Sequence, residues 1–117
     1  MEQFCGVCCY AGRPQPYTVT HSRPQHPEPV VITGDRHSTF VSDLKLDFKD
    51  PASPTVASEF TGTSITSGGD NGTYGAYYGP MISETPHIKF FDGDRRGYVR
   101  CRVTRELWRS DLAWSPR

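Results

Sequence analysis

The strongest chemical signal in this chain is a carboxylate and an imidazole two residues apart, directly after a short apolar run. The run Val30–Thr33 is followed by Gly34, Asp35, Arg36 and His37. In an extended chain, side chains two residues apart point the same way, and their Cα atoms lie about 6.6 Å apart. Paired metal ions lie about 3.5–4 Å apart, so Asp35 and His37 can each reach one ion. Spacing alone favours a plainer interpretation, a strand end with a capping aspartate and an exposed histidine.

A second candidate is the Cys-x-x-Cys pair formed by Cys5 and Cys8, with Cys9 beside it. Such a pair is half of a structural zinc site, which needs four ligands. No second pair follows, and His21 and His26 lie among prolines with no helix expected before them. We therefore favour an adventitious cysteine cluster over a zinc-binding module.

Length and composition limit what can position these groups. The 117 residues suffice for one small domain. Thirteen basic and thirteen acidic residues cancel, so charge alone indicates neither a nucleic-acid nor a membrane partner. No apolar run approaches the roughly 20 residues that span a bilayer, and no signal peptide is visible. Eleven glycines and ten prolines make the chain rich in turns, and scarce Ala and Leu favour β structure.

Several apolar or alternating segments predict short strands. They cover residues 30–33, 40–48, 55–61, 87–91 and 98–104. In the second segment, Phe40 and Leu44 share the face that we expect to be buried, opposite Asp43 and Lys45. The Asp-Gly pair at 92–93 and the closing Gly97 predict that the last two segments form a hairpin.

The other segments show no clear period. Residues 1–28 are proline-rich and predict an irregular or disordered leader. Residues 74–80 predict an aromatic, glycine-spaced loop, and Thr104 is suited to cap a short helical turn within 104–112. The expected fold class is α+β, mostly β, with little helix.

Three segments together resemble the alkaline phosphatase D (PhoD-like) family of metallophosphoesterases. The residues that carry the resemblance are Val30–Ser38 with its Gly-Asp-x-His, Glu59–Gly69 with its Ser/Gly-rich turn, and Pro86–Cys101. They occur in the family's order. The resemblance covers roughly residues 29–112, and it makes residues 29–117 the C-terminal segment of a PhoD-like domain.

This resemblance implies an α/β/β/α sandwich with iron and calcium ions at its active site, acting on phosphomonoesters or phosphodiesters, in proteins that are commonly exported. Asp35 and His37 match the family's Gly-Asp-x-His metal ligands. Asp35 suits the harder, oxygen-preferring ion and His37 suits iron. The family's other ligands come from a long upstream segment that is not found here, so no catalytic residue is assigned.

Other residues are weaker candidates for binding the phosphoester substrate. His87 lies beside Lys89 on one strand and is a candidate substrate-binding residue, although such residues are more often solvated or packed in the sheet. Arg95 and Arg96 are suited to clamp a phosphate, but loop arginines are usually just solvated. The tyrosines of 74–80 could line a pocket or simply pack on the sheet.

The sequence therefore predicts a C-terminal fragment of a phosphatase D-like hydrolase, inactive without a missing N-terminal half. The alternative is a non-catalytic small β module, or a truncated-gene product without an enzymatic role. A half-sandwich would leave apolar strand faces and an edge unpaired, so we also expect poor solubility or self-association.

Overall fold

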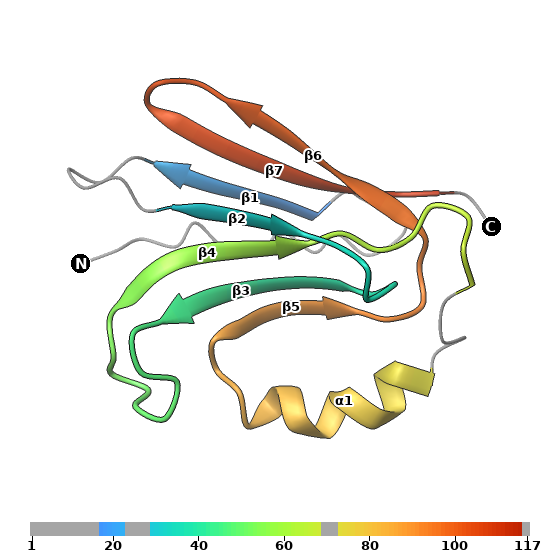
Figure 1. Cartoon of the computed structure of the whole chain (residues 1–117), viewed down its shortest axis with the longest axis horizontal. Coiled ribbons are helices and arrows are strands. Elements are labelled where there is room, and N and C mark those ends of the chain that lie inside the picture. The colour runs from blue at the N-terminus through green and yellow to red at the C-terminus, as the bar shows by residue number, and fades with distance from the viewer. Residues whose placement is uncertain (1–16, 23–28, 69–72, 116–117) are drawn as a thin grey trace.

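Two facing β-sheets and one helix make up the computed structural model, which describes residues 17–22, 29–68 and 73–115 (Figure 1). The elements are β1 (Tyr17–Ser22), β2 (Val30–Thr33), β3 (Thr39–Lys45), β4 (Thr55–Thr61), α1 (Thr73–Ser83), β5 (Ile88–Asp92), β6 (Gly97–Val103) and β7 (Leu107–Trp114). The predicted α+β class with mostly strands is confirmed. Strands β2 and β4 begin and end at the predicted residues.

The four-stranded sheet has the order β2-β4-β3-β5. Strand β2 runs parallel to β4, and the other neighbours are antiparallel. The Val-Val-Ile-Thr sequence of β2 suits a strand because branched side chains pack well on a pleated surface. The parallel β2–β4 pair brings Thr33 and Thr61, the last residues of both strands, to the same end of the sheet.

The three-stranded sheet has the order β1-β7-β6, with antiparallel neighbours throughout. Its strand β1 lies within the leader that was expected to be irregular, so that expectation is wrong for residues 17–22. The proline-rich composition around β1 hid its pairing, because its partner β7 lies near the other end of the sequence. The rest of the leader, with the cysteine pair and His26, lies outside the described residues.

The expected hairpin between residues 87–91 and 98–104 is wrong, because β5 and β6 belong to different sheets. The Asp92 side chain accepts hydrogen bonds from the backbone N–H groups of Asp94 and Arg95, at 3.0 and 2.9 Å. This turn leads the chain across to the other sheet, where Gly97 N–H donates to Ser64 O at 3.1 Å. The Asp-Gly pair and Gly97 correctly indicated that the chain turns after β5. They could not indicate that β6 pairs with β7 and not with β5.

The actual hairpin joins β6 to β7 at the place where a helical turn was expected. Thr104 Oγ1 accepts hydrogen bonds from the N–H groups of Glu106 and Leu107, at 3.2 and 3.0 Å. A threonine hydroxyl caps a helix start and a tight turn with the same kind of bond. The role of Thr104 was therefore recognised, but the structure that follows it was not.

The core lies between the two sheets. Val41, Phe60 and Leu112 are its buried centre, and the residues packed around them are Val30, Phe90, Val99, Trp108 and Trp114. In β3 the core side chain is Val41, so the expectation that Phe40 and Leu44 form the only buried face is corrected. Asp43 is also buried, at 4% exposure, because β3 is an inner strand covered on both faces.

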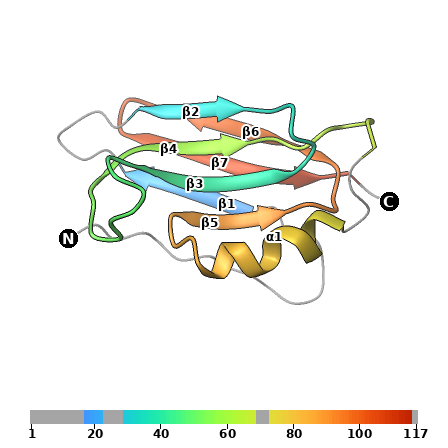
Figure 2. The ribbon, with the colours of Figure 1, turned by 60° about the horizontal axis from the view of Figure 1, so that its bottom comes forward.

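Helix α1 replaces the aromatic loop that was expected at residues 74–80, and it lies against the outer face of the four-stranded sheet (Figures 1 and 2). Tyr78 packs edge-on against Phe40 of β3 and Phe91 of β5, with ring centroids 6.4 and 5.9 Å apart. Thr85 Oγ1 donates to the backbone oxygen of Met81 at 2.7 Å, near the helix end. The segment's own helix propensity is poor, so packing on the sheet stabilises the helix.

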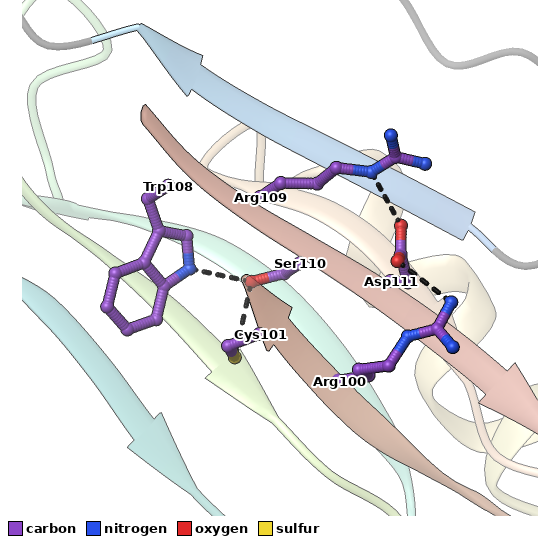
Figure 3. Close-up of polar contacts among 6 residues, drawn as sticks. All are labelled: Arg100, Cys101, Trp108, Arg109, Ser110 and Asp111. Carbon is purple, nitrogen blue, oxygen red and sulfur yellow. Dashed lines mark hydrogen bonds and ion pairs between the residues drawn. The ribbon is translucent and has the colours of Figure 1, made fainter. Parts of the chain in front are cut away.

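The three-stranded sheet holds a buried carboxylate on the face that points away from the core (Figure 3). Asp111 is 2% exposed. Its oxygens lie 3.1 Å from Arg100 Nη2 and 3.0 Å from Arg109 Nε. On the core side, Ser110 Oγ accepts a 2.8 Å hydrogen bond from the indole of Trp108. These paired polar groups satisfy buried atoms on both faces of β7.

Candidate functional site

The candidate site lies at one end of the four-stranded sheet, where β2, β4 and β5 end and β3 begins. The three connections at this end are residues 34–38, 62–68 and 93–96. Gly62 N–H donates to Thr33 O at 2.9 Å, which holds the second connection against the end of β2. The carboxyl ends of sheet strands are the usual place for ligands in parallel sheets, because the connections there diverge and leave room.

Asp35 and His37 are presented by a tight turn and not by the extended chain assumed from their spacing. The backbone N–H of Arg36 donates to Gly34 O at 2.9 Å, which closes a three-residue γ-turn centred on Asp35. Asp35 has φ 70° and His37 has φ 56°, and both are positive values outside glycine. A γ-turn with positive φ is rare and strained, and such strain gathers at functional sites.

The His37 imidazole is oriented by the neighbouring connection. Its Nδ1 lies 2.8 Å from the backbone oxygen of Gly68. Because a carbonyl oxygen only accepts hydrogen bonds, Nδ1 carries the proton, and in the neutral ring Nε2 keeps its lone pair. A metal-binding histidine is commonly held in this way by a backbone carbonyl. His37 is half-buried and Asp35 is exposed, so both remain reachable from solvent.

Arg36, between the two candidate ligands, is turned toward helix α1. Its guanidinium donates to the hydroxyl of Tyr78 and lies over the Tyr78 ring, 5.5 Å from the centroid. Tyr78 in turn packs on Phe40 and Phe91. The turn of residues 34–37, here called the ligand turn, therefore contacts α1 through Arg36 and the Gly68 carbonyl through His37.

The donor set fits part of a metal site. A carboxylate suits hard cations and an imidazole suits transition metals. Among the residues that the structure describes, no group of three or more His, Cys, Asp or Glu side chains could hold an ion. Asp35 and His37 would thus supply at most two donors to an ion, and a complete site would need further ones. The possible zinc ligands Cys5 and Cys8 lie outside the described residues.

Two buried hydroxyls that the sequence did not point to lie next to this turn. Ser38 Oγ and Thr63 Oγ1 are buried and have no hydrogen-bond partner within the described ranges. The β3–β4 ladder pairs Phe40 with Thr61, and the same register continued by two residues places Ser38 opposite Thr63. No local pattern identifies them, because serine and threonine are common in turns and their burial depends on the tertiary fold.

His87 is not brought together with Asp35 and His37. It directly precedes β5, and its backbone oxygen accepts a 2.8 Å hydrogen bond from Asp43 N–H. The four residue steps from Thr39 to Asp43 span about 13 Å of strand, so His87 lies toward the other end of β3. Its ring packs edge-on against Phe48, with centroids 5.0 Å apart.

The remaining phosphate-binding candidates already have structural contacts. Arg95 Nε pairs with Asp92 Oδ2 at 2.6 Å, and its guanidinium lies 4.5 Å from the centroid of the Trp114 ring. The aromatic contacts of Tyr78 likewise attach α1 to the sheet. Across the described part of the chain, no helix is long and apolar enough to span a bilayer.

Comparisons with known proteins agree on one family. A family model described as PhoD-like phosphatase matches residues 10–112. "Alkaline phosphatase D" of Bacillus subtilis (strain 168) is 46% identical over 87 residues, which are 74% of this chain and 15% of that protein. The solved "Structure of PhoD" matches with TM-score 0.59 and 40% identity, over 75% of this chain and 19% of that one. The chain thus spans less than a fifth of the relatives that it matches.

Proposed function

Because the chain belongs to the PhoD-like phosphatase family, we propose that it is part of a metal-dependent phosphoric ester hydrolase. Asp35 and His37 are two of the metal ligands in this proposal, and residues 29–117 are a C-terminal segment of the enzyme domain. The substrates would be phosphomonoesters or phosphodiesters, the class implied by the family resemblance.

The observation that carries the proposal is the strained turn of Gly34, Asp35 and His37. It places a carboxylate and an oriented imidazole at the end of a sheet, in a backbone conformation that costs about 1–3 kcal/mol for each unusual residue. The Gly68 carbonyl accepts a hydrogen bond from Nδ1, so Nε2 is the nitrogen whose lone pair can bind a metal ion. A turn needed only to connect β2 to β3 would be less strained with glycine at these positions.

The donor chemistry divides the two ligands between two kinds of ion. We assign Asp35 to calcium, a hard cation that prefers oxygen, and His37 to iron, which imidazole suits. When bound, the ions supply Lewis-acid activation of the phosphoester and of a water nucleophile. The chain's own contribution is to carry the two donors in one tight turn and to fix the tautomer of His37 through Gly68.

The isolated chain is expected to be inactive because the described residues supply only two donors. Its relatives are five to seven times longer than the matched segment, judged from coverage of 19% and 15%. The further donors would then come from a portion that this chain does not span.

A chimera tests the proposal with a positive result. In the Bacillus subtilis alkaline phosphatase D, the segment that aligns with this chain is replaced by the chain's own residues. We expect hydrolysis of bis-p-nitrophenyl phosphate, with iron and calcium present by elemental analysis. Asp35→Ala and His37→Ala should each lower kcat/KM about 100-fold or more, since even outer groups around metal ligands are worth 10–100-fold.

The matched control is Asp47→Ala, an exposed aspartate in the β3–β4 turn at the other end of the sheet. It should leave activity and metal content unchanged. His87→Ala tests its separate role: a raised KM with unchanged kcat would support substrate binding. A folded chimera that hydrolyses nothing, or that is insensitive to Asp35→Ala and His37→Ala, would contradict the proposal and favour a non-catalytic β module.

A further inference from the structure

The strained ligand turn has to be held in shape by contacts with the rest of the fold. Asp35 and His37 both have positive φ, at 70° and 56°. Such conformations persist only where the surrounding structure fixes them. Within the described residues, two side chains of the turn make hydrogen bonds to other segments: His37 Nδ1 with Gly68 O, and Arg36 with the hydroxyl of Tyr78.

Arg36 contacts Tyr78 in two ways at once. Its guanidinium donates a hydrogen bond to the Tyr78 hydroxyl, and Arg36 Cζ lies 5.5 Å from the centroid of the same ring. A guanidinium is planar and always charged, so it both donates hydrogen bonds and interacts with an aromatic face. The contact therefore depends on the residue type on both sides.

Tyr78 is itself fixed to the sheet from which the ligand turn extends. Its ring packs edge-on against Phe40 of β3 and Phe91 of β5, with centroids 6.4 and 5.9 Å away. The rings of Phe40 and Phe91 also pack on each other, at 4.8 Å. Phe40 lies near the start of β3, shortly after the turn in sequence. The chain from Arg36 to Phe40 and the contacts through Tyr78 thus form a closed loop, which limits how far the turn can move.

The two candidate metal ligands are not held equally well. His37 has its own hydrogen bond to Gly68 O, at 2.8 Å, and is half-buried. Asp35 is exposed, and its position depends on the backbone that it shares with Arg36. Without the contact to Tyr78, His37 would stay oriented by Gly68, whereas Asp35 would be free to relax from φ 70°. The contact therefore matters more for Asp35 than for His37.

We propose that Tyr78, acting through Arg36, is a positioning residue for the carboxylate of Asp35. The inference rests on the proposed function, in which Asp35 binds calcium and His37 binds iron. Groups that orient a metal ligand without touching the ion typically contribute about 10–100-fold to metal affinity. Loss of the contact should therefore weaken calcium binding and leave iron binding nearly unchanged.

The variants must separate this role from the packing of α1 on the sheet. Tyr78→Phe keeps the ring that packs on Phe40 and Phe91 and removes only the hydroxyl that Arg36 contacts. Arg36→Met removes the guanidinium and keeps much of the length of the side chain. The matched control is Tyr77→Phe, which makes the same change at the neighbouring position of α1, where the side chain is 66% exposed.

Calorimetric titration of calcium into the iron-loaded chimera that carries this chain's residues tests the proposal. Tyr78→Phe and Arg36→Met should each raise the calcium dissociation constant about 10-fold or more, with the iron content unchanged by elemental analysis. The double variant should bind calcium no more weakly than the weaker single variant, because both replacements remove the same contact. Tyr77→Phe should match the unsubstituted chimera.

NMR of the full chain without metal gives a second result that does not depend on calcium or on turnover. The Cα and Cβ chemical shifts of Asp35 depend on its φ, so they should change in Tyr78→Phe and in Arg36→Met and stay the same in Tyr77→Phe. The Nδ1–H signal of His37 should persist in all three variants, because Gly68 O still accepts its hydrogen bond.

Asp35→Ala separates a failure of this inference from a failure of the proposed function. If it raises the calcium dissociation constant and neither Tyr78→Phe nor Arg36→Met does, the positioning role is wrong and the proposed ligands stand. If it has no effect, Asp35 is not a calcium ligand and both proposals are overturned. A raised KM in Arg36→Met with unchanged calcium affinity would show that Arg36 binds substrate instead. Equal losses of iron and calcium in Tyr78→Phe would show that its hydroxyl only stabilises the fold.

Discussion

Replacing both arginines that hold Asp111 should destabilise the fold by more than the sum of the two single replacements. The Asp111 side chain is 3% exposed, whereas Arg100 and Arg109 are 56% and 44% exposed. The free-energy cost of removing water from these charged groups is therefore borne mostly by the Asp111 carboxylate. Either arginine alone still gives it a charged partner, at 3.1 or 3.0 Å.

The magnitudes follow from this asymmetry. Each single Arg→Met replacement loses an ion pair that solvent already weakens, so it should cost about 1 kcal/mol. Arg100→Met with Arg109→Met leaves a buried carboxylate without either cation, a change that typically costs about 3–5 kcal/mol. The coupling between the two sites is therefore about 1–3 kcal/mol. Asp111→Asn removes the charge that needs pairing and should cost only about 1–2 kcal/mol.

Urea denaturation followed by circular dichroism measures the free energy of unfolding of each variant at a fixed chain concentration. Arg102→Met is the control, because Arg102 lies exposed on the same strand as Arg100, and it should change stability by no more than about 0.5 kcal/mol. Additive losses in the double variant would refute the reasoning, since they would mean that water already solvates the carboxylate. A double variant milder than Asp111→Asn would refute it equally.

Three further predictions concern single residues and the isolated chain. Gly97→Ala should prevent stable folding, as seen by loss of a cooperative thermal transition, because a Cβ at Gly97 would overlap the backbone oxygen of Ala113; an unchanged Tm would contradict this. Asp35→Gly should be more stable to urea than Asp35→Ala by about 1 kcal/mol, because glycine relieves the strain at φ 70°, and equal stabilities would exclude that strain. The purified chain should not hydrolyse bis-p-nitrophenyl phosphate with added calcium and iron, and turnover abolished by His37→Ala would show that the site is complete.

Strands β2 and β4 were predicted correctly because their signals are local. Each is a run of branched or alternating residues, bounded by Pro29 and Gly34 in the first case and by Pro54 and Gly62 in the second. The Gly-Asp-x-His turn was likewise located at the end of β2. Its shape was not, because the positive φ values of Asp35 and His37 arise where the chain must turn from β2 into β3.

The errors occurred where the structure depends on distant partners. Helix α1 forms from a segment rich in tyrosine and glycine because Tyr78 packs on Phe40 and Phe91. Strand β1 forms by pairing with β7, about ninety residues further along the chain. The turn after β5 has the residues of a hairpin, but β6 pairs with β7 instead. Pairing between distant segments leaves no periodic signal in either one.

By itself, the sequence determined the mostly-β class and the family, because these depend on residue type, short motifs and local alternation. It also led to the prediction that Asp35 and His37 are metal ligands. The tertiary structure decided which strands pair and how His37 is oriented by Gly68. It also decided that His87 lies away from the ligand turn, and that Arg36 contacts Tyr78 of α1. These features follow from contacts between segments far apart in the chain, whose formation depends on the packing of the whole molecule.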